Sequence, residues 1–457
     1  MNRDILSLEQ ECALQQFENG DNLIVTGPAG TGKTKLIQYF LESAKERKKN
    51  IQVCAMTGCA ALLLTGCNAS TIHSWSGIRT ANKDVNTIIT SVLENKTAIQ
   101  KWRKVNILII DEVSMMSEKI FDLLNELGKH TRQKTEEFGG IQVVFMGDFY
   151  QLPPVGREER FCFESAFWYK VFDLDNHIVL QTIFRQRDPI HQSILSSIRC
   201  GEMERTQIEF LQKYVNRVYD IESHGGCVPM KLFPTRQKVD SVNQSMFQQL
   251  EGPSYEYNYI QKSNCITYLE SGTPIPTEKA KKTITTKQKE YEMDSLLKNS
   301  PAEQKLHLKK GTNVMCTVNL DLDIGICNGS IGVVIDFQPN VTGIPIPIVR
   351  FSNGIVKQIP IKYWQSEEFP VLAIGQIPLC YAWAITIHKI QGATLSLAEI
   401  DIGHNIFEYG QSYVALSRMK DLDGLYLSGF SPSKIKVHPK VKAFYCAIPK
   451  VEYEIET

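Results

Sequence analysis

A glycine-rich segment near the N-terminus narrows the possible folds of this chain more than its composition does. Gly27-Pro28-Ala29-Gly30-Thr31-Gly32-Lys33-Thr34 fits the phosphate-binding pattern G-x-x-x-x-G-K-[ST]. The apolar run Leu23–Thr26 precedes it, and Lys33–Lys48 follows with apolar residues at helical spacing. Glycines let backbone N–H groups approach phosphates, and a helix N-terminus favours their negative charge. The segment therefore predicts a nucleotide site in which Lys33 reaches the phosphates and Thr34 holds Mg²⁺.

Further strand-length runs alternate with helical segments along the first third of the chain. The runs are Ile51–Met56, Ile107–Ile110 and Gln142–Met146. Strands buried on both faces and separated by helices indicate a parallel sheet in an α/β layer. A second α/β region begins near Phe172, with expected strands and a helix at Ile178–Leu180, Lys231–Phe233 and Val239–Leu250.

The composition changes in the second half of the chain. Residues 252–308 are rich in Pro, Thr, Lys, Glu and Tyr and lack periodicity, which predicts an irregular charged insertion. Residues 309–364 contain short strand signals separated by Asn-Gly turns, which predicts a small inserted β-barrel. The expected domains are 1–171 for the first, and 172–251 with 365–457 for the second, whose sheet resumes at Leu379–Thr386.

Polar residues at the ends of two expected strands complete a catalytic pattern. Asp111 and Glu112 follow Ile107–Ile110, so Asp111 is expected to bind Mg²⁺ and Glu112 to polarise the attacking water. Gln151, in Gly147-Asp148-Phe149-Tyr150-Gln151, follows another strand and is placed to sense the γ-phosphate. Gln10 has two interpretations: with Ser7 it fits a helix capping box, or it recognises the adenine edge.

Two arginines follow apolar segments of the second α/β region. Arg185 lies in Thr182-Ile183-Phe184-Arg185-Gln186, and Arg418 ends Tyr413-Val414-Ala415-Leu416-Ser417-Arg418. An ATP held between two domains requires cations from the facing domain, which can accelerate hydrolysis by about 10³–10⁵-fold. A surface ion pair is the alternative for each.

Composition excludes several protein classes. The 457 residues contain 50 Lys plus Arg and 50 Asp plus Glu, so the net charge neither indicates nor excludes nucleic acid. No apolar run is long enough for a membrane span, and no apolar segment at the N-terminus indicates secretion. The 12 cysteines form no Cys-x-x-Cys pair, which indicates free thiols in a reducing compartment.

Ten motifs in a fixed order resemble one family. They are GPAGTGKT, TGCAALLL, STIHSW, IIDEVSMM, GGIQVVFMGDFYQLPPV, FRQRD, PTRQKVDSVN, KKGTNVM, PLCYAWAITIHKIQGATL and YVALSRM. The order resembles the petite-integration-frequency (PIF) DNA helicases, related to RecD, in the 5′→3′ branch of helicase superfamily one. The resemblance runs from about Ser7 to Tyr445 and implies two RecA-like P-loop domains, with the small β-barrel inserted in the second.

The resemblance also implies roles for individual residues. The ATP-site positions are Gln10, Gly27, Pro28, Ala29, Gly30, Thr31, Gly32, Lys33, Thr34, Asp111, Glu112, Gln151, Arg185 and Arg418, with Gln391 and Gly392 linking nucleotide to DNA. The DNA-facing positions are Thr57, Gly58, His73, Phe149, Pro234, Thr235, Arg236, Thr386, His388 and Lys389. Hydroxyls and basic groups suit phosphates and aromatics suit bases, although packing in the core is the alternative for His73 and Phe149.

The chain departs from the family pattern at two places. Ile390 stands where the family has serine, which removes one hydroxyl from the DNA-contact motif. Residues 252–300 match no family pattern, and their role is open.

The sequence therefore predicts an ATP-dependent 5′→3′ DNA helicase that acts in replication, recombination or repair, with ATP and Mg²⁺. The expected partners are single-stranded DNA and forked or tailed duplexes, and the resemblance allows G-quadruplexes and RNA–DNA hybrids. The family resemblance implies a monomer in solution. The expected location is the nucleus or cytoplasm, and the resemblance allows a viral origin. The alternatives are a translocase that strips proteins without unwinding, and an ATP-gated scaffold or loader.

Overall fold

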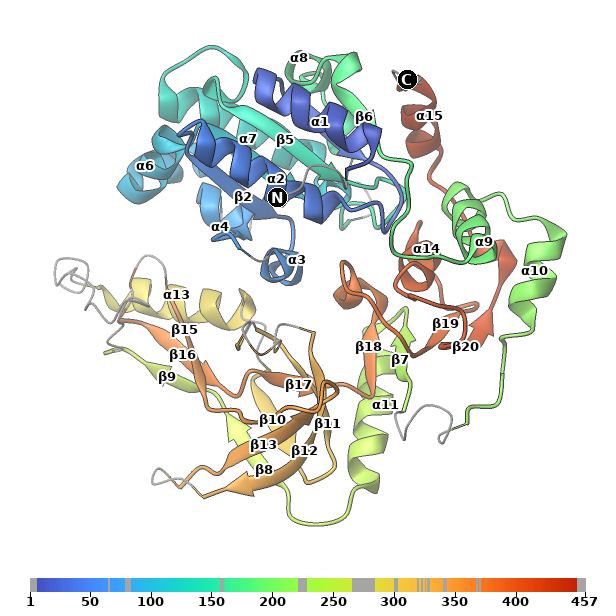
Figure 1. The fold of residues 1–457 in the computed structure, drawn as a ribbon. Coiled ribbons are helices and arrows are strands. Elements are labelled where there is room, and N and C mark those ends of the chain that lie inside the picture. The colour runs from blue at the N-terminus through green and yellow to red at the C-terminus, as the bar shows by residue number, and fades with distance from the viewer. Residues whose placement is uncertain are drawn as a thin grey trace. The chain divides into compact units, whose positions relative to one another are not determined.

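The computed structural model describes residues 6–64, 66–78, 84–156, 160–220, 228–264, 284–299, 303–318, 320–321, 324, 326, 329–339, 343–366, 369 and 371–449. The chain divides into two compact units: unit 1 comprises Met1–Thr235 and Thr386–Thr457, and unit 2 comprises Arg236–Ile385 (Figure 1). Unit 1 contains two α/β lobes: the first holds the expected region 1–171, and the second holds most of 172–235 and 386–457. Residues 236–251 and 365–385, expected in the second α/β region, belong to unit 2 instead.

The first lobe is built on a six-stranded parallel sheet with the order β3-β2-β4-β5-β1-β6. Its strands are β1 (Leu23–Thr26), β2 (Ile51–Ala55), β3 (Ser70–Thr71), β4 (Ile107–Asp111), β5 (Gln142–Gly147) and β6 (His177–Val179). Strands β1 and β4 are buried at every residue, as expected for a parallel sheet covered on both faces.

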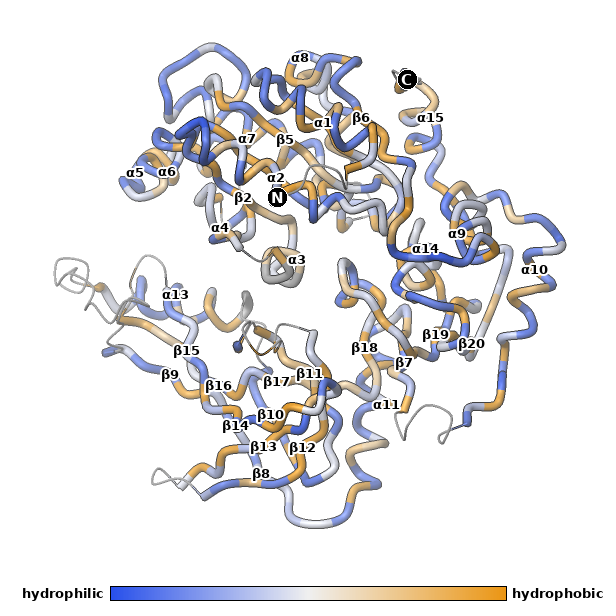
Figure 2. The backbone as a smooth tube through the Cα atoms, viewed as in Figure 1, coloured by the Kyte–Doolittle hydropathy of each residue, from blue (hydrophilic) through white to orange (hydrophobic). Residues whose placement is uncertain are grey.

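Helices cover both faces of this sheet, because alternate strand residues enter two different cores. Ile107 and Ile109 pack with α1 and α2, whereas Leu108 and Ile110 pack with α5, α6 and α7. The helices are α1 (Leu8–Asn19), α2 (Lys33–Glu46), α3 (Gly58–Leu63), α4 (Ile72–Ser76), α5 (Val85–Glu94), α6 (Lys96–Lys104), α7 (Glu118–Arg132) and α8 (Trp168–Val171). Figure 2 shows hydrophobic colours along the central strands.

The second lobe repeats the α/β arrangement on a smaller scale. Strand β19 (Ala398–Ile402) pairs in parallel with both β7 (Met230–Phe233) and β20 (Leu425–Phe430). Its helices are α9 (Pro189–Cys200), α10 (Arg205–Gln212) and α14 (Gln411–Leu416). The expected fold class, two RecA-like α/β lobes with a small inserted β-structure, is confirmed.

Two boundaries expected from the sequence are wrong. Strand β6 was expected in the second domain, but it pairs with β1 and completes the first sheet. The C-terminal helix α15 (Pro439–Ala447) also belongs to the first lobe, because Phe444 packs on Phe149 and Phe163 in its aromatic core. Burial of aromatic surface brings this last helix back to the lobe where the chain began.

Unit 2 is mainly antiparallel. One sheet has the order β14-β13-β12-β11-β17, a second β15-β16-β9 and a third β10-β8. The elements are α11 (Arg236–Gln249), β8 (Tyr255–Asn258), β9 (Ile260–Lys262), α13 (Thr286–Asn299), β10 (Lys305–Leu308), β11 (Asn313–Cys316), β12 (Ile331–Gln338), β13 (Ile346–Phe351), β14 (Val356–Gln358), β15 (Lys362–Gln365), β16 (Ala373–Gln376) and β17 (Leu379–Tyr381). Strand β18 (Ala384–Thr386) then leads back to unit 1.

The inserted region is larger and more regular than expected. The described parts of 252–308 form β8, β9, α13 and β10, so they are not irregular; residues 265–283 and 300–302 lie outside the described residues. The strands expected within 309–364 are present, but β17 pairs with β11, so the inserted sheet continues beyond residue 364. In the part that the structure describes, this sheet is open, with β14 and β17 at its edges. No helix in that part is long and apolar enough to cross a bilayer.

Candidate active site

The phosphate-binding loop joins β1 to α2, as the sequence predicts. Gly30 and Gly32 adopt positive φ angles of 87° and 79°. A Cβ on Gly30 would lie 2.7 Å from Arg185 Cβ, and one on Gly32 would lie 2.8 Å from Gln10 Nε2, so both positions require glycine. Helix α2 begins at Lys33, and its N-cap residue Gly32 has no side chain to cap the first amides, which suits the binding of an anion there.

Lys33 is held by its own loop. Its Nζ donates hydrogen bonds to the carbonyl oxygens of Gly27 at 2.7 Å and Pro28 at 2.9 Å. Burial lowers the pKa of this ammonium, while the carboxylates of Asp148, Glu112 and Asp111 act in the opposite direction. The positive charge therefore stays close to the position expected for phosphates.

Asp111 and Glu112 lie together at the carboxyl end of β4. Burial, and then the charge of Glu112, raise the pKa of Asp111 to about 7. The backbone N–H of Glu112 donates to Asp111 Oδ1 at 2.8 Å, and Glu112 adopts the left-handed conformation with φ of 55°. A non-glycine residue in this conformation is strained, which is common where a catalytic side chain must be directed into a site.

Three buried glutamines each have an Oε1 without a hydrogen-bond partner among the described residues. They are Gln151, Gln186 and Gln391. Gln391 uses its Nε2 to bind Glu112 Oε2 at 2.9 Å, and Gln186 uses its Nε2 to bind the Met419 carbonyl at 2.9 Å. Unpaired buried acceptors are rare in native proteins and mark places for a ligand or water.

The two arginines predicted for the ATP site meet at Ser417. Arg185 Nη1 donates to the Ser417 carbonyl at 3.0 Å, and Arg418 Nη2 donates to Ser417 Oγ at 2.9 Å. Arg418 also donates to the Val414 carbonyl and is only 2% exposed. Burial, and then the neighbouring Arg185, lower the pKa of Arg418 to about 10. Because Arg418 is buried, the surface ion-pair alternative is wrong for this residue. Arg185 is half-buried and forms no ion pair with a described carboxylate.

Gln10 satisfies the capping-box interpretation. The Ser7 N–H donates to Gln10 Oε1 at 3.1 Å, and the Gln10 N–H donates to Ser7 Oγ. The Gln10 Nε2 also donates to the Thr31 carbonyl at 3.0 Å, so the side chain lies against the phosphate-binding loop. Recognition of adenine by Gln10 stays a prediction.

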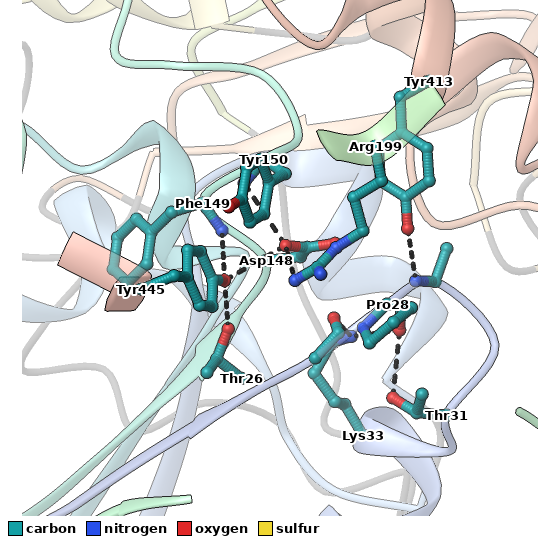
Figure 3. Close-up of polar contacts among 12 residues, drawn as sticks. Thr26, Pro28, Thr31, Lys33, Asp148, Phe149, Tyr150, Arg199, Tyr413 and Tyr445 are labelled. Carbon is teal, nitrogen blue, oxygen red and sulfur yellow. Dashed lines mark hydrogen bonds and ion pairs between the residues drawn. The ribbon is translucent and has the colours of Figure 1, made fainter. Parts of the chain in front are cut away.

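A buried ion pair that sequence reasoning missed joins the two lobes. Asp148 follows β5, and both its oxygens accept hydrogen bonds from Arg199 on α9 at 2.9 Å (Figure 3). Tyr445 on α15 donates to Asp148 Oδ1 at 3.1 Å. The Arg199 guanidinium stacks 4.4 Å from the ring centre of Tyr150. Burial opposes ionisation of Asp148, but Arg199 and Lys33 lower its pKa.

The same view shows a second contact between the lobes (Figure 3). The Ala29 N–H, in the phosphate-binding loop, donates to the Tyr413 hydroxyl at 2.8 Å. Asp148 lies in the motif GGIQVVFMGDFYQLPPV, and Tyr445 lies at the end of the family resemblance, but only an acidic and an aromatic side chain mark them in the sequence. Arg199 lies on an amphipathic helix and carries no sequence signal of its own.

A cavity of about 1270 Å³ lies beside Arg199 and Tyr445 and is lined in part by Pro28, Ala29 and Tyr413.

The DNA-facing positions differ in accessibility. Gly58, Arg236 and Lys389 are exposed, and Thr57, His73, Thr235, Thr386 and His388 are half-buried. Thr57 Oγ1 caps α3 by accepting from the Ala60 N–H, and the Pro234 carbonyl accepts from Gln411. The His388 ring stacks on Phe407, which is 62% exposed and which sequence reasoning missed.

Phe149 is a correction. It is only 2% exposed and packs edge-on against Phe163, Trp168 and Phe444, so its ring has no face free for a base. The core alternative is therefore the right one. Ile390 is likewise 3% exposed, so its side chain contributes to the core of the second lobe and does not face solvent.

Known proteins resemble the chain over nearly its whole length. Residues 5–207 match the family described as PIF1-like helicase, and residues 292–337 match DNA helicase Pif1, 2B domain. The ATP-dependent DNA helicase PIF1 of Danio rerio is 34% identical over 97% of this chain and 64% of its own length. The ATP-dependent DNA helicase RRM3 of Saccharomyces cerevisiae is 30% identical over 96% of this chain and 67% of its own. The chain thus spans less than two thirds of the Danio rerio relative.

Solved structures show the same similarity. The Pif1 helicase of Candida albicans has 34% identity and a TM-score of 0.81, over 97% of this chain and 100% of that one. Bacteroides Pif1 in complex with ADP-AlF3 and single-stranded DNA has 26% identity and a TM-score of 0.65, with 97% of each chain covered. A structure of two coordinating Pif1 helicases, described as the basis for unwinding forked duplex DNA, has 27% identity and a TM-score of 0.68, with 97% of each covered.

Proposed function

The chain belongs to the PIF1-like helicase family, and we propose that it is an ATP-dependent DNA helicase that moves 5′→3′ along single-stranded DNA. The observation that carries the proposal is the position of Arg185 and Arg418, which meet at Ser417 while the Arg185 segment contacts the phosphate-binding loop. Rapid ATP hydrolysis at a P-loop requires positive side chains that stabilise the transition state, and a second lobe can supply them. A helicase of this kind binds ATP between its lobes.

The proposed nucleotide binding begins with an exchange of hydrogen-bond partners in the phosphate-binding loop. Lys33 exchanges the carbonyls of Gly27 and Pro28 for phosphate oxygens, which form stronger charge-assisted hydrogen bonds. The uncapped N-terminus of α2 supplies amides to the same phosphates. Gln10, whose Nε2 donates to the Thr31 carbonyl, is the residue proposed to contact the base.

The residues at this site fit a Mg²⁺ ion. Thr34 offers a hydroxyl and Asp111 a carboxylate, and no group of three or more His, Cys, Asp or Glu side chains that could hold a metal is found in the described part of the chain. Mg²⁺ suits such a sparse oxygen set, because it keeps waters and substrate phosphates as its other ligands. When bound, the ion neutralises phosphate charge. Asp111 must lose its proton to hold it.

Hydrolysis uses Glu112 and the glutamines around it. The Glu112 carboxylate accepts a proton from the attacking water, and its strained backbone and Gln391 hold it in position. The Gln151 Oε1, which has no hydrogen-bond partner in the described part of the chain, is the group proposed to orient that water. Arg185 and Arg418 leave Ser417 to stabilise the charge that develops on the γ-phosphoryl group.

Single-stranded DNA is the proposed track. Thr57, Thr235 and Thr386 offer hydroxyls, and Arg236, His388 and Lys389 offer basic groups for the backbone. The exposed Phe407 ring beside His388 adds an aromatic surface on which a base can stack. Gly58, His73 and Pro234 are the remaining proposed contacts. The Bacteroides structure with single-stranded DNA supports this substrate class.

Forked and tailed duplexes are the proposed substrates for unwinding, in replication, recombination or repair, as the forked-DNA relative suggests. G-quadruplexes and RNA–DNA hybrids are further candidates that only direct assays address. We propose that the protein acts as a monomer, in the nucleus or cytoplasm of a cell or as a viral enzyme.

The decisive experiment measures steady-state ATP hydrolysis with and without single-stranded DNA, for the wild type and Lys33→Ala. We expect strong stimulation by DNA that disappears in the variant, while DNA binding persists. The control is Lys35→Ala, because Lys35 is exposed and lies two residues after Lys33 in α2. This variant should hydrolyse ATP at the wild-type rate. A wild-type rate that ignores DNA would favour an ATP-gated scaffold or loader instead.

Two further assays separate the motor classes. Unwinding of 5′-tailed but not 3′-tailed duplexes supports the proposed polarity. Removal of a bound protein block from single-stranded DNA without strand separation would favour the non-unwinding translocase.

A further inference from the structure

Tyr413 connects the second lobe directly to the phosphate-binding loop. It lies on α14 and is 2% exposed, and its hydroxyl accepts a hydrogen bond from the Ala29 N–H at 2.8 Å. The two residues are 384 positions apart in the sequence. Backbone amides of such a loop are the groups that bind phosphate oxygens. A side chain of the second lobe therefore binds one amide of a loop whose amides the proposed nucleotide would use.

We infer that the Tyr413 hydroxyl competes with a nucleotide phosphate for the Ala29 amide, and that it yields the amide when the phosphate binds. The inference rests on the proposed binding of ATP at this loop. It assigns to Tyr413 the role of a positioning residue through which the second lobe detects an occupied loop.

The competition favours the phosphate. Tyr413 is buried, and this burial raises the pKa of its hydroxyl, which is therefore neutral. A neutral phenol accepts a weaker hydrogen bond than an anionic phosphate oxygen does. Without nucleotide, the hydroxyl accepts the hydrogen bond of the buried Ala29 N–H, which would otherwise destabilise the fold as an unpaired buried donor. With nucleotide, the phosphate replaces it.

Displacement of Tyr413 would act on the arginines, because they are bound to the same short segment. Helix α14 spans Gln411–Leu416, and Ser417 follows it directly. The Ser417 carbonyl accepts from Arg185 and from Gln186, and Arg418 donates to the Val414 carbonyl of α14. Movement of Tyr413 would thus shift the backbone groups that hold both guanidinium groups when no nucleotide is bound.

The test is nucleotide binding to Tyr413→Phe without DNA, measured by titration calorimetry with Mg–ADP and with a non-hydrolysable Mg–ATP analogue. The variant keeps the ring but loses the competing hydroxyl. We expect both nucleotides to bind about 2- to 10-fold more tightly than to the wild type. Equal or weaker binding would overturn the inference, because a hydroxyl that holds the nucleotide would act in the opposite direction.

Tyr257→Phe is the matched control. Tyr257 is also buried, and its hydroxyl donates to the Pro345 carbonyl at 2.8 Å within unit 2. Its loss should leave nucleotide affinity unchanged. If the wild type binds neither nucleotide, the proposed function fails together with the inference; if the wild type binds and Tyr413→Phe binds no more tightly, only the inference fails.

Thermal unfolding gives a second readout. Without nucleotide, Tyr413→Phe should melt below the wild type, because the Ala29 amide has lost its partner. At saturating Mg–ADP the two proteins should melt at the same temperature. A deficit that persists at saturation would overturn the inference, since it would show that the hydroxyl remains engaged when nucleotide is bound.

Discussion

The Nε2 of Gln391 donates a hydrogen bond to Glu112 Oε2 at 2.9 Å, between residues 279 positions apart. Gln391 directly follows the 3₁₀ turn Ile387–Ile390, which carries His388 and Lys389. The group proposed to activate water is therefore bound by the neighbour of two groups proposed to bind DNA. A shift of this turn on a DNA strand would therefore act on Glu112 through the Gln391 hydrogen bond.

Replacement of Gln391 by methionine tests this connection. The variant keeps the length of the side chain but removes the hydrogen bond to a carboxylate, which contributes about 1.5–3 kcal/mol. We expect DNA-stimulated ATP turnover to fall by about 10-fold or more, with a smaller fall in the DNA-free rate. Steady-state hydrolysis across a range of single-stranded DNA concentrations measures both.

Gln358→Met is the matched control, because Gln358 is exposed on β14 in unit 2. Equal losses with and without DNA would mean that Gln391 only positions Glu112. Unchanged rates in both conditions would contradict any role for this hydrogen bond.

Mg²⁺-dependent nucleotide binding should depend on pH through Asp111. Burial and the Glu112 charge raise the pKa of Asp111 to about 7, from an ordinary value of 3.8. Only the carboxylate binds the ion, so the affinity for Mg–ADP should rise as the pH increases from 6 to 8. Because the folded state holds the proton more tightly, this group also makes the nucleotide-free protein less stable as the pH rises from about 4 to about 7.

Calorimetric titration of Mg–ADP at pH 6, 7 and 8 measures the effect. Asp111→Asn removes the titrating group and should bind weakly at every pH, without the slope. A wild-type affinity that stays constant across this range would contradict the proposed role of Asp111.

The sequence predicted those parts of the site that are continuous in the chain. The loop Gly27–Thr34 and the pair Asp111 and Glu112 follow apolar strands, and a parallel sheet places the ends of such strands at one edge. For these residues, the position in the sequence directly after a strand also gives the position at the edge of the sheet.

Contacts between distant segments could not be predicted in this way. Asp148 meets Arg199 and Tyr445, which lie 51 and 297 positions further along the chain. The sequence of β6 also does not show whether this strand joins the first or the second sheet; in the structure it pairs with β1 at the edge of the first. Phe149 was ambiguous because a buried aromatic and a base-stacking aromatic have the same sequence context, and only packing around the ring distinguishes them.

The Asp148–Arg199 pair should contribute strongly to stability. Asp148 is fully buried, the Arg199 side chain is 11% exposed, and the two make two hydrogen bonds to each other. Removal of one partner from a buried pair costs about 3–5 kcal/mol. We expect Asp148→Asn and Arg199→Gln each to lower the melting temperature at pH 7. The double variant should lose less than the sum of the two losses, because the second substitution removes a charge that is already unpaired.

The same pair predicts a response to acid. Arg199 and Lys33 hold the pKa of Asp148 below 3.8, despite the opposing effect of burial. A lowered native pKa stabilises the folded state above the unfolded value, and this contribution is lost as the pH falls further through the native value. Melting temperatures of the wild type and Asp148→Asn should therefore converge as the pH falls below about 4. A gap that stays constant down to acid pH would contradict the assignment.

Phe149 and His388 should respond in opposite ways to replacement by leucine. Phe149 lies in the aromatic core, so Phe149→Leu should lower the melting temperature and leave the affinity for single-stranded DNA within about twofold of the wild type. His388 lies half-buried beside the exposed Phe407, so His388→Leu should weaken DNA binding by about 5-fold or more while the melting temperature changes little. Fluorescence anisotropy with a labelled oligonucleotide, at a temperature where both variants are folded, measures the affinities. A large loss of affinity in Phe149→Leu would mean that its ring leaves the core to stack on a base.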